Sequence, residues 1–423
     1  MTYTPSKQYK ALGTETITGH LASISAVRTV LGDTPDRWQA EEVGDGNLNL
    51  VFIVRAGRKS VIAKQALPYV RLVGESWPLP LSRAYFEHEA LMRQEVAVPG
   101  LTPKLIAYDH DMALIVMEHL TPHIILRKGF IAGQRYPYLA EHAGRFMAET
   151  LFSYSDLALD GETKRNNVAL FSGNHVMCAL TEQVIFDDPY FDAPLNRHTS
   201  PQLDALSAEI RHDSTLKIAA QELKTLFMSK TQTLLHGDLH TGSIMVTEDD
   251  TRVIDPEFAF YGPMGFDIGA LMANFLLAYF SQRGHATATD DRIAYGEWLL
   301  QTLLQTFAVF EAEFSALWRQ RRVGSLYPES LFDGDATAAS ERALSGYLRD
   351  VMVDSIGFTG AKMLRRILGI AHVEDMEAIA DPDLRAACEA QALALARILI
   401  TDRARISSFD DVVRMAREIG VPS

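Results

Sequence analysis

The sequence is poor in cysteine and in basic charge. Its two cysteines, Cys178 and Cys388, stand far apart among 423 residues, which argues against a disulfide framework or a zinc knuckle and is typical of a reducing cytoplasm. The formal net charge is −14, from 40 basic and 54 acidic residues, and no dense patch of lysine and arginine occurs. Because a phosphate backbone is held by such patches, we expect no nucleic-acid partner.

The sequence also lacks a long hydrophobic run. Residues 268–280 form its most apolar stretch, but they include Asn274 and fall short of the roughly 20 apolar residues that span a bilayer. Residues 1–13 are polar and lack the apolar core of a secretory signal. We therefore expect a buried helix at 268–280, no membrane partner and a cytoplasmic location.

The sequence does contain a clear change of pattern near residue 120. Before it, apolar β-branched runs at 50–54 and 61–63 flank a turn signal and predict a hairpin, and residues 81–96 have helical periodicity. A chain of 423 residues exceeds one ordinary hydrophobic core. We therefore predict an α+β fold with a small strand-rich lobe at 1–119 and a large, mainly helical lobe at 120–423.

Long amphipathic or buried helical segments dominate the second lobe. They are predicted at residues 138–152, 200–229, 266–280, 292–318, 341–370 and 384–401. The exception is a strand-rich island at 233–262, in which two short strands joined by a tight turn run out and back. Asp238 precedes the first strand and Asp255 follows the second, so this hairpin should bring the two carboxylates together.

Two neighbouring carboxylates suit phosphoryl transfer. Asp238 would accept a hydrogen bond from the attacking hydroxyl, while Asp255 and Glu257 would hold a Mg²⁺ ion that bridges the phosphates of ATP. The alternative is that both aspartates only cap turns at strand ends. His236 and His240 have the spacing of a helical metal pair, but they enter a loop and a strand without an evident third ligand, so we expect a positioning role.

A nucleotide-binding pattern precedes this island. Gly44, Gly46 and Asn47 belong to a glycine-rich turn (GDGNLN) whose backbone amides would approach the phosphates of ATP. Lys64 ends the apolar run 61–64 (VIAK), which is close to the strand that carries the phosphate-binding lysine of kinases. A lysine at a strand end is often simply solvated, so the indication comes from the turn and the lysine together.

Two further groups complete the expected ATP site. Glu87 on the following helix would pair with Lys64, although Glu89 fits the periodicity equally well. The residues that fall where the lobes would join, and whose backbone would face an edge of adenine, are Met117, Glu118 and Leu120.

These residues resemble the protein-kinase-like superfamily, in its aminoglycoside-phosphotransferase and choline-kinase branch. The form HGDLH at 236–240 is typical of that branch. The runs GESWPL at 74–79, GDLHTGSI at 237–244, DPEFAFYGPMGFD at 255–267 and KMLRR at 362–366 are similar to the 5-methylthioribose kinase family. This resemblance implies a bilobal protein-kinase-like fold with a small antiparallel sheet. It also implies transfer of the γ-phosphate of ATP to the anomeric hydroxyl of 5-methylthioribose, in methionine salvage.

The resemblance also implies roles for particular residues and a homodimer. By this resemblance Asp238 is the catalytic residue and contacts the sugar. Asp255 and Glu257 bind Mg²⁺, and Lys64 contacts the phosphates of ATP. Arg365 and Arg366 would line the sugar and phosphoryl site, where a guanidinium group stabilises spreading charge. Without the resemblance, an exposed cationic helix face would be the preferred interpretation of these two arginines.

One position departs from the general kinase pattern. The broad superfamily has a metal-binding Asn five residues after the catalytic aspartate, whereas Ser243 stands there in this chain. Serine is the poorer ligand, so Glu257 is expected to carry more of the metal binding. The segment 74–82, which contains Trp77, is expected either to cover a ligand or to pack on its own lobe.

Two other functions are compatible with part of this pattern. One is another small-molecule kinase of the same branch, for example one that acts on choline or an aminoglycoside. The other is a nucleotide-binding pseudokinase, which is disfavoured because Lys64, Asp238 and Asp255 are all present.

Overall fold

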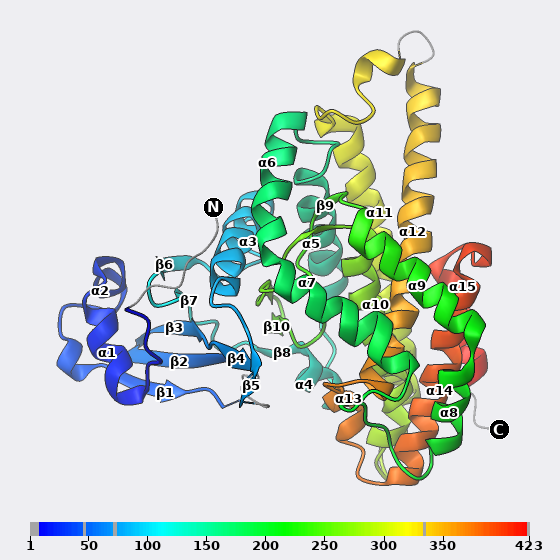
Figure 1. The fold of residues 1–423 in the computed structure, drawn as a ribbon, viewed down its shortest axis with the longest axis horizontal. Helices are drawn as coiled ribbons and strands as arrows, with labels where there is room; N and C mark the ends of the chain where they lie inside the picture. Colours follow the sequence, from blue (N-terminus) through cyan, green and yellow to red (C-terminus); the bar gives the residue numbers. More distant parts are fainter. Residues whose placement is uncertain (1–7, 45–47, 71–73, 333–335, 421–423) are drawn as a thin grey trace.

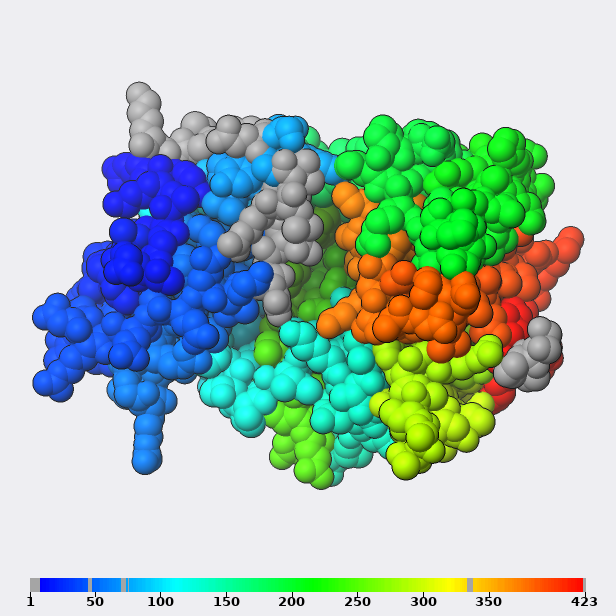
Figure 2. Space-filling view, turned by 90° about the horizontal axis from the view of Figure 1, so that it is seen from below, coloured from blue at the N-terminus to red at the C-terminus, as the bar shows by residue number. Residues whose placement is uncertain are grey.

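A computed structural model describes residues 8–44, 48–70, 74–332 and 336–420. The fold is α+β and bilobal, with an antiparallel sheet in the smaller lobe and helices in the larger one (Figure 1). The space-filling view shows the N-terminal residues, in blue, at one end and the residues in green to red at the other (Figure 2). The predicted fold class is confirmed, and the exact boundary between residues 119 and 120 stays a prediction.

The smaller lobe is built on a five-stranded antiparallel sheet. Its order is β1 (Gln39–Glu42), β2 (Asn49–Ala56), β3 (Lys59–Ala66), β7 (Leu114–Glu118) and β6 (Leu105–Asp109). Strands β2 and β3 form the predicted hairpin and place Val51 opposite Lys64. Phe52, Val54 and Val61 lie fully buried under helices α1 (Thr14–Ala22) and α2 (Ser25–Leu31). Because side chains alternate along a strand, Lys64 points to the opposite face.

Helix α3 (Arg83–Ala97) covers that opposite face of the sheet, where its Ala84 and Leu91 pack with Ile115 of β7. Between β3 and α3, strands β4 (Tyr69–Val70) and β5 (Gly74–Pro78) form a small ribbon that carries Trp77. Sheet and helix together therefore bring Lys64 and α3 face to face.

Helix α10 (Met264–Ser281) is the central helix of the larger lobe. The segment Met264–His285 is apolar and long enough to cross a membrane, but 94% of its most apolar window is buried inside the protein. It is therefore a core helix, as predicted, and it packs against α11 (Ile293–Arg321), α12 (Ala336–Leu368) and α14 (Pro382–Thr401). A Cβ atom at Gly269 would lie 2.5 Å from the carbonyl oxygen of Ser355, so glycine allows the close approach of α12.

Eight further α-helices complete the described part of the larger lobe. They are α4 (Leu126–Ile131), α5 (Leu139–Ser153), α6 (Gly161–Phe171), α7 (His175–Glu182), α8 (Asp204–His212), α9 (Ser214–Ser229), α13 (Glu374–Glu377) and α15 (Phe409–Gly420). The single helical segment predicted at 200–229 is therefore wrong, because it is two helices. Asp213 ends α8 in an extended conformation and its carboxylate accepts a hydrogen bond from the Leu216 amide at the start of α9, which is a standard N-cap.

The strand-rich island forms two small sheets near the smaller lobe. One has the order β11 (Thr251–Val253), β10 (Ile244–Val246) and β8 (Ile124–Ile125), and the other pairs β12 (Tyr261–Gly262) with β9 (Thr233–Leu234). Strands β10 and β11 are antiparallel with Ile244 opposite Val253. The predicted hairpin is thus present, and the segments that carry Asp238 and Asp255 meet beside it where His236 contacts Ile254.

Candidate active site

The segment 236–240 forms a loop between β9 and β10. Its conformation is fixed by a glycine and by hydrogen bonds to its backbone amides. Gly237 has a φ of 85°, and a Cβ atom there would lie 2.1 Å from the carbonyl oxygen of Phe258, so only glycine fits. The two carboxylate oxygens of Asp267 on α10 accept hydrogen bonds from the amides of His236 (2.6 Å) and Gly237 (3.0 Å). The core helix therefore positions the loop directly.

His236 joins this loop to the segment that carries Asp255. Its Nε2 lies 2.9 Å from the carbonyl oxygen of Ile254, and its Nδ1 lies 3.3 Å from the amide of Asp238. Since a carbonyl can only accept, Nε2 carries the proton and Nδ1 accepts. Burial lowers the pKa of His236, which agrees with this neutral form. His236 therefore links the two segments by hydrogen bonds, in keeping with the positioning role expected from the sequence.

Asp238 is held by three cationic or donor groups. Its Oδ1 lies 3.0 Å from the ammonium of Lys362, and its Oδ2 lies 3.2 Å from Nε2 of His240 and 3.7 Å from Nη2 of Arg366. Burial would raise the pKa of Asp238, but Lys362, His240 and Arg366 hold it well below its usual range. The side chain keeps 25% of its surface exposed, so an ionised carboxylate remains open to a ligand.

His240 is a neutral donor in this arrangement. Its Nδ1 accepts a hydrogen bond from the amide of Gly242 at 2.8 Å, which leaves Nε2–H to donate to Asp238. Burial lowers the pKa of His240 to about 3. The ring therefore holds Oδ2 of Asp238 without adding a positive charge.

Ser243 stabilises the same loop. Its hydroxyl accepts from the amide of His240 at 2.9 Å and lies within donating distance of the carbonyl oxygens of Asp238 (3.1 Å) and His240 (2.9 Å). The side chain is buried, and its hydroxyl makes its hydrogen bonds with backbone groups of the loop. This geometry explains how serine can replace asparagine here, because the residue supports the loop that presents Asp238.

Lys64 is a buried lysine among carboxylates. Its ammonium lies 2.7 Å from Oε1 of Glu87 on α3 and also pairs with Asp255. Burial alone would lower the pKa of Lys64, but Asp255, Glu87 and Glu257 raise it above its ordinary value, so the lysine stays charged. Glu89, the alternative partner, instead binds Arg93 at 2.7 Å.

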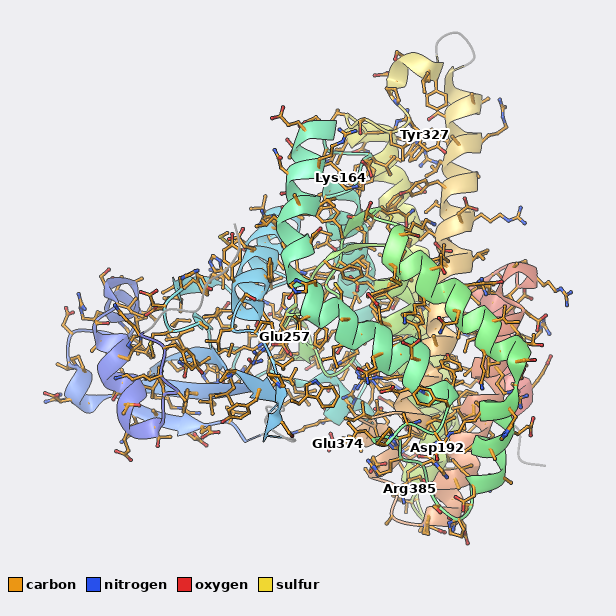
Figure 3. All side chains as sticks on the ribbon, viewed as in Figure 1. Lys164, Asp192, Glu257, Tyr327, Glu374 and Arg385 are labelled. Carbon is orange, nitrogen blue, oxygen red and sulfur yellow. The ribbon has the colours of Figure 1, made fainter. Side chains whose placement is uncertain are left out.

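Asp255 and Glu257 lie at the junction of the lobes. Asp255 has a left-handed backbone with a φ of 70°, a strained conformation for a residue other than glycine. Glu257 is 2% exposed, and its Oε2 accepts a hydrogen bond from the amide group of Asn49 (2.8 Å) and lies 3.5 Å from Nε of Arg83. Figure 3 shows Glu257 between the sheet and the helical lobe.

The carboxylates here fit a divalent cation. Oxygen atoms of Glu87, Asp255 and Glu257 lie within 4.8 Å of one another. These three acidic groups face two cations, Lys64 and Arg83. Burial, Asp255 and Glu257 raise the pKa of Glu87, although Lys64 lowers it. A hard cation with oxygen ligands would relieve this excess of negative charge.

The other predicted ATP contacts lie along the edge of the smaller lobe. Gly44 is exposed in a turn after β1, whereas Gly46 and Asn47 lie outside the described residues. Met117 and Leu120 are each 7% exposed where β7 leaves the sheet. Between them, Glu118 accepts a hydrogen bond from the amide of Lys104 at 3.2 Å, so its side chain is tied to the neighbouring strand.

Arg365 and Arg366 lie on α12 beside the loop 236–240 rather than on an exposed face. Both donate to the carbonyl oxygen of Ala371, at 3.3 and 3.0 Å. Burial lowers the pKa of both arginines. Arg127 of α4 adds a third guanidinium, 3.0 Å from a carboxylate oxygen of Asp375. Together with Lys362 these groups make the surroundings of Asp238 strongly cationic.

Sequence reasoning missed several of these groups. It assigned no role to Lys362, Arg83, Asn49, Asp267 or Arg127. A signal existed for Lys362, because it precedes Arg366 by four residues and therefore shares a helix face with it. Asn49 and Arg83 contact Glu257 across the chain, and nothing in their local sequence indicates this.

Trp77 was expected either to cover a ligand or to pack on its own lobe, but it packs against residues of both lobes. Its partly buried indole packs on the cluster of Leu79 and Met177, together with Phe258. Leu79 belongs to the smaller lobe, whereas Met177 on α7 and Phe258 belong to the larger one. The segment therefore contributes to the contact between the lobes.

Comparison with known proteins places this geometry in a family. Residues 39–305 match the model described as "Phosphotransferase enzyme family". The chain is 46% identical over 408 residues to methylthioribose kinase 1 of Oryza sativa subsp. japonica, covering 96% of this chain and 94% of that protein. It is 45% identical over 411 residues to a methylthioribose kinase of Escherichia coli O45:K1, covering 97% and 98%. A solved glucosamine kinase with glucosamine, ADP and inorganic phosphate aligns with a TM-score of 0.50 at 14% identity, covering 93% and 88%, which supports the fold.

Proposed function

This chain belongs to the phosphotransferase enzyme family, within its methylthioribose kinases, and from that membership we infer that it phosphorylates 5-methylthioribose. The reaction transfers the γ-phosphoryl group of ATP to the anomeric 1-hydroxyl and yields 5-methylthioribose 1-phosphate, a step of methionine salvage. The relatives match at 39–46% identity over 90% or more of this chain, and the geometry around Asp238 suits the chemistry. We expect the enzyme to act in the cytoplasm.

Asp238 is the proposed catalytic residue. In the reaction a bond forms between the sugar oxygen and the γ-phosphorus, and the bond from that phosphorus to the β–γ bridging oxygen breaks. The hydroxyl proton passes to the carboxylate of Asp238, which first orients the hydroxyl by accepting its hydrogen bond. Because Lys362 and His240 hold both carboxylate oxygens in place, this orientation exists before the substrate binds.

Arg365 and Arg366 are proposed to hold the sugar and the transferring phosphoryl group. Charge spreads over three phosphoryl oxygens during transfer, and buried guanidinium groups stabilise it more strongly than water does. The carbonyl oxygen of Ala371 fixes both side chains. This carbonyl therefore sets the direction in which the cationic groups face.

Lys64 and Glu87 are proposed to bind the phosphates of ATP, with Gly44, Gly46 and Asn47 above them and Met117, Glu118 and Leu120 beside adenine. Mg²⁺ would be held by Asp255 and Glu257 and would neutralise charge on the phosphates. Lys64 pairs with Asp255, and phosphate oxygens would compete for that ammonium. We further expect a homodimer, which light scattering on the purified protein would test.

The test of this function is an ATP-dependent assay that couples ADP release to a spectroscopic signal. The acceptors are 5-methylthioribose, ribose, choline and an aminoglycoside, each at the same concentration. We expect turnover with 5-methylthioribose and little with the others. Turnover confined to choline or the aminoglycoside would replace this proposal with another kinase of the same branch.

A further inference from the structure

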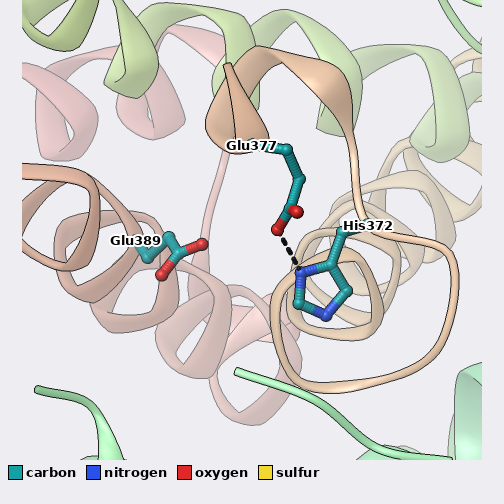
Figure 4. Close-up of side chains that lie close together, drawn as sticks. All are labelled: His372, Glu377 and Glu389. Atoms are coloured by element: carbon teal, nitrogen blue, oxygen red, sulfur yellow. Dashed lines mark hydrogen bonds and ion pairs between the residues drawn. The ribbon is translucent and has the colours of Figure 1, made fainter. Parts of the chain in front are cut away.

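A second cluster of potential ligands lies in the larger lobe, apart from the carboxylates at the lobe junction. His372 follows α12, Glu377 ends α13, and Glu389 lies on α14 (Figure 4). One ligand atom from each residue lies within 4.8 Å of the other two. Three separate segments of the chain therefore direct an imidazole and two carboxylates toward one point.

The hydrogen bonds of His372 determine which nitrogen is free. Its Nε2 lies 2.9 Å from the carbonyl oxygen of Arg197 and 3.0 Å from that of Gly369. Carbonyl oxygens only accept, so Nε2 carries the proton. In the neutral ring Nδ1 then has a lone pair, which faces Oε1 of Glu377 at 2.9 Å. The lone pair of Nδ1 and the oxygen of Glu377 repel each other unless a proton or a metal ion lies between them.

Glu389 provides a second, independent indication. Its side chain has no exposed surface, and neither carboxylate oxygen has a hydrogen-bond partner of normal geometry among the residues that the structure describes. Burial raises the pKa of Glu389, and the nearby Thr199 hydroxyl and Arg385 only partly oppose this rise. In Figure 4 this carboxylate points toward Glu377 and the ring of His372. A buried carboxylate without such a partner is strongly unfavourable, so Glu389 needs a proton or a cation in addition to Arg197, which binds Glu377 at 3.0 Å.

The chemistry of the donors indicates which cation fits. One imidazole nitrogen with two carboxylates is a donor set for zinc and similar first-row divalent ions, whereas Mg²⁺ and Ca²⁺ favour oxygen alone. A ligating histidine usually donates its other N–H to a carbonyl or carboxylate, as His372 does to Arg197 and Gly369. Glu377 is 31% exposed, and its outer partner Arg197 is 59% exposed, so an ion can enter from solvent.

We propose that His372, Glu377 and Glu389 form a structural site for a divalent transition-metal ion of the Zn²⁺ type. The ion would bind Nδ1 of His372 and one oxygen of each carboxylate, with water completing the tetrahedron. It would fix the loop after α12, whose Ala371 carbonyl holds Arg365 and Arg366. The site thus supports the proposed acceptor arginines from behind, without contacting substrate.

The test measures Zn²⁺ binding to untagged, metal-stripped protein by isothermal titration calorimetry, and Co²⁺ binding by its visible absorption. We expect one tightly bound equivalent in the wild type and a raised melting temperature in its presence. Glu389→Gln and His372→Gln should each weaken binding by about tenfold or more. His212→Gln, an exposed histidine of α8, and Asp255→Ala, at the junction of the lobes, should bind Zn²⁺ as the wild type does.

Two outcomes would overturn this proposal. One is wild-type binding weaker than about 100 μM, roughly 5–6 kcal/mol of binding free energy, which would mean that protons neutralise the cluster. The other is undiminished binding in both Glu389→Gln and His372→Gln. If these two variants do not fold, Glu377→Gln replaces them, because its partly exposed side chain tolerates the change. None of these measurements requires ATP or sugar, so the result is independent of the proposed function.

Discussion

The ammonium group of Lys362 lies between the carboxylate of Asp238, 3.0 Å away, and the ring of Phe266, whose centroid is 4.4 Å away. Only 5% of the Lys362 side chain is exposed. A buried lysine held on an aromatic face has little freedom to move. One carboxylate oxygen of Asp238 is therefore fixed by Lys362 from α12 and the other by His240.

Replacement of Asp238 by alanine should nearly abolish phosphoryl transfer while ATP binding is retained. The carboxylate acts mainly in the transition state, so we expect kcat to fall by about 100- to 10,000-fold. Steady-state kinetics and a titration with ATP measure the two effects. A rate near that of the wild type would mean that another residue accepts the proton.

Replacement of Lys362 by methionine should change the pH profile as well as the rate. Lys362 holds the pKa of Asp238 well below its usual range, so loss of the lysine raises this pKa. Protonated Asp238 cannot accept the hydroxyl proton, and the loss of activity on the acid side should therefore move to higher pH. We expect kcat to fall by up to about 100-fold, with unchanged affinity for ATP.

The matched control for Lys362 is Lys230→Met. Lys230 also binds an aspartate of α12, Asp354, at 2.6 Å, but neither residue contacts Asp238. Its replacement should leave the pH profile unchanged. Equal profiles for the Lys362 and Lys230 variants would show that Lys362 only stabilises the fold.

Replacement of Asp255 by alanine should weaken the binding of Mg·ATP. Removal of this carboxylate leaves the cation with fewer oxygen ligands, so ATP affinity measured with Mg²⁺ should fall more than affinity measured without it. Asp249→Ala, in the turn between β10 and β11, is the control. An unchanged affinity in the Asp255 variant would exclude a role in metal binding.

Replacement of Glu87 by glutamine should raise KM for ATP, because Lys64 then turns further toward Asp255. Glutamine keeps the size of the side chain and removes the charge that pairs with Lys64 at 2.7 Å. Glu89→Gln is the control, since Glu89 binds Arg93. Equal KM values for the two variants would count against a role for the Lys64–Glu87 pair in ATP binding.

Local patterns of the sequence predicted much of this architecture. The hairpin of β2 and β3, the core helix α10 and the pairing of β10 with β11 all depend on residues close together in the chain. For that reason apolar alternation and turn residues were sufficient. The two-helix structure of 200–229 was missed because the capping role of Asp213 overrides a continuous apolar pattern.

The contacts that complete the site depend on residues far apart in the chain. Lys362 reaches Asp238 because Gly269 lets α12 pack closely on α10, and Asn49 reaches Glu257 because the two lobes meet there. Periodicity carries no information about such pairs. Their side chains are also individually ordinary, so only the three-dimensional fold reveals them.

The contacts of Glu257 have a consequence for how the enzyme can vary. The same carboxylate that is proposed to hold the cation is fastened to Asn49 on β2 and to Arg83 on α3. Cation affinity and the contact between the lobes are therefore thermodynamically linked, because both depend on the carboxylate of Glu257. A substitution that changes how the lobes meet at Asn49 or Arg83 should therefore change the affinity for the proposed cation, and a change in the cation ligands should alter the contact between the lobes.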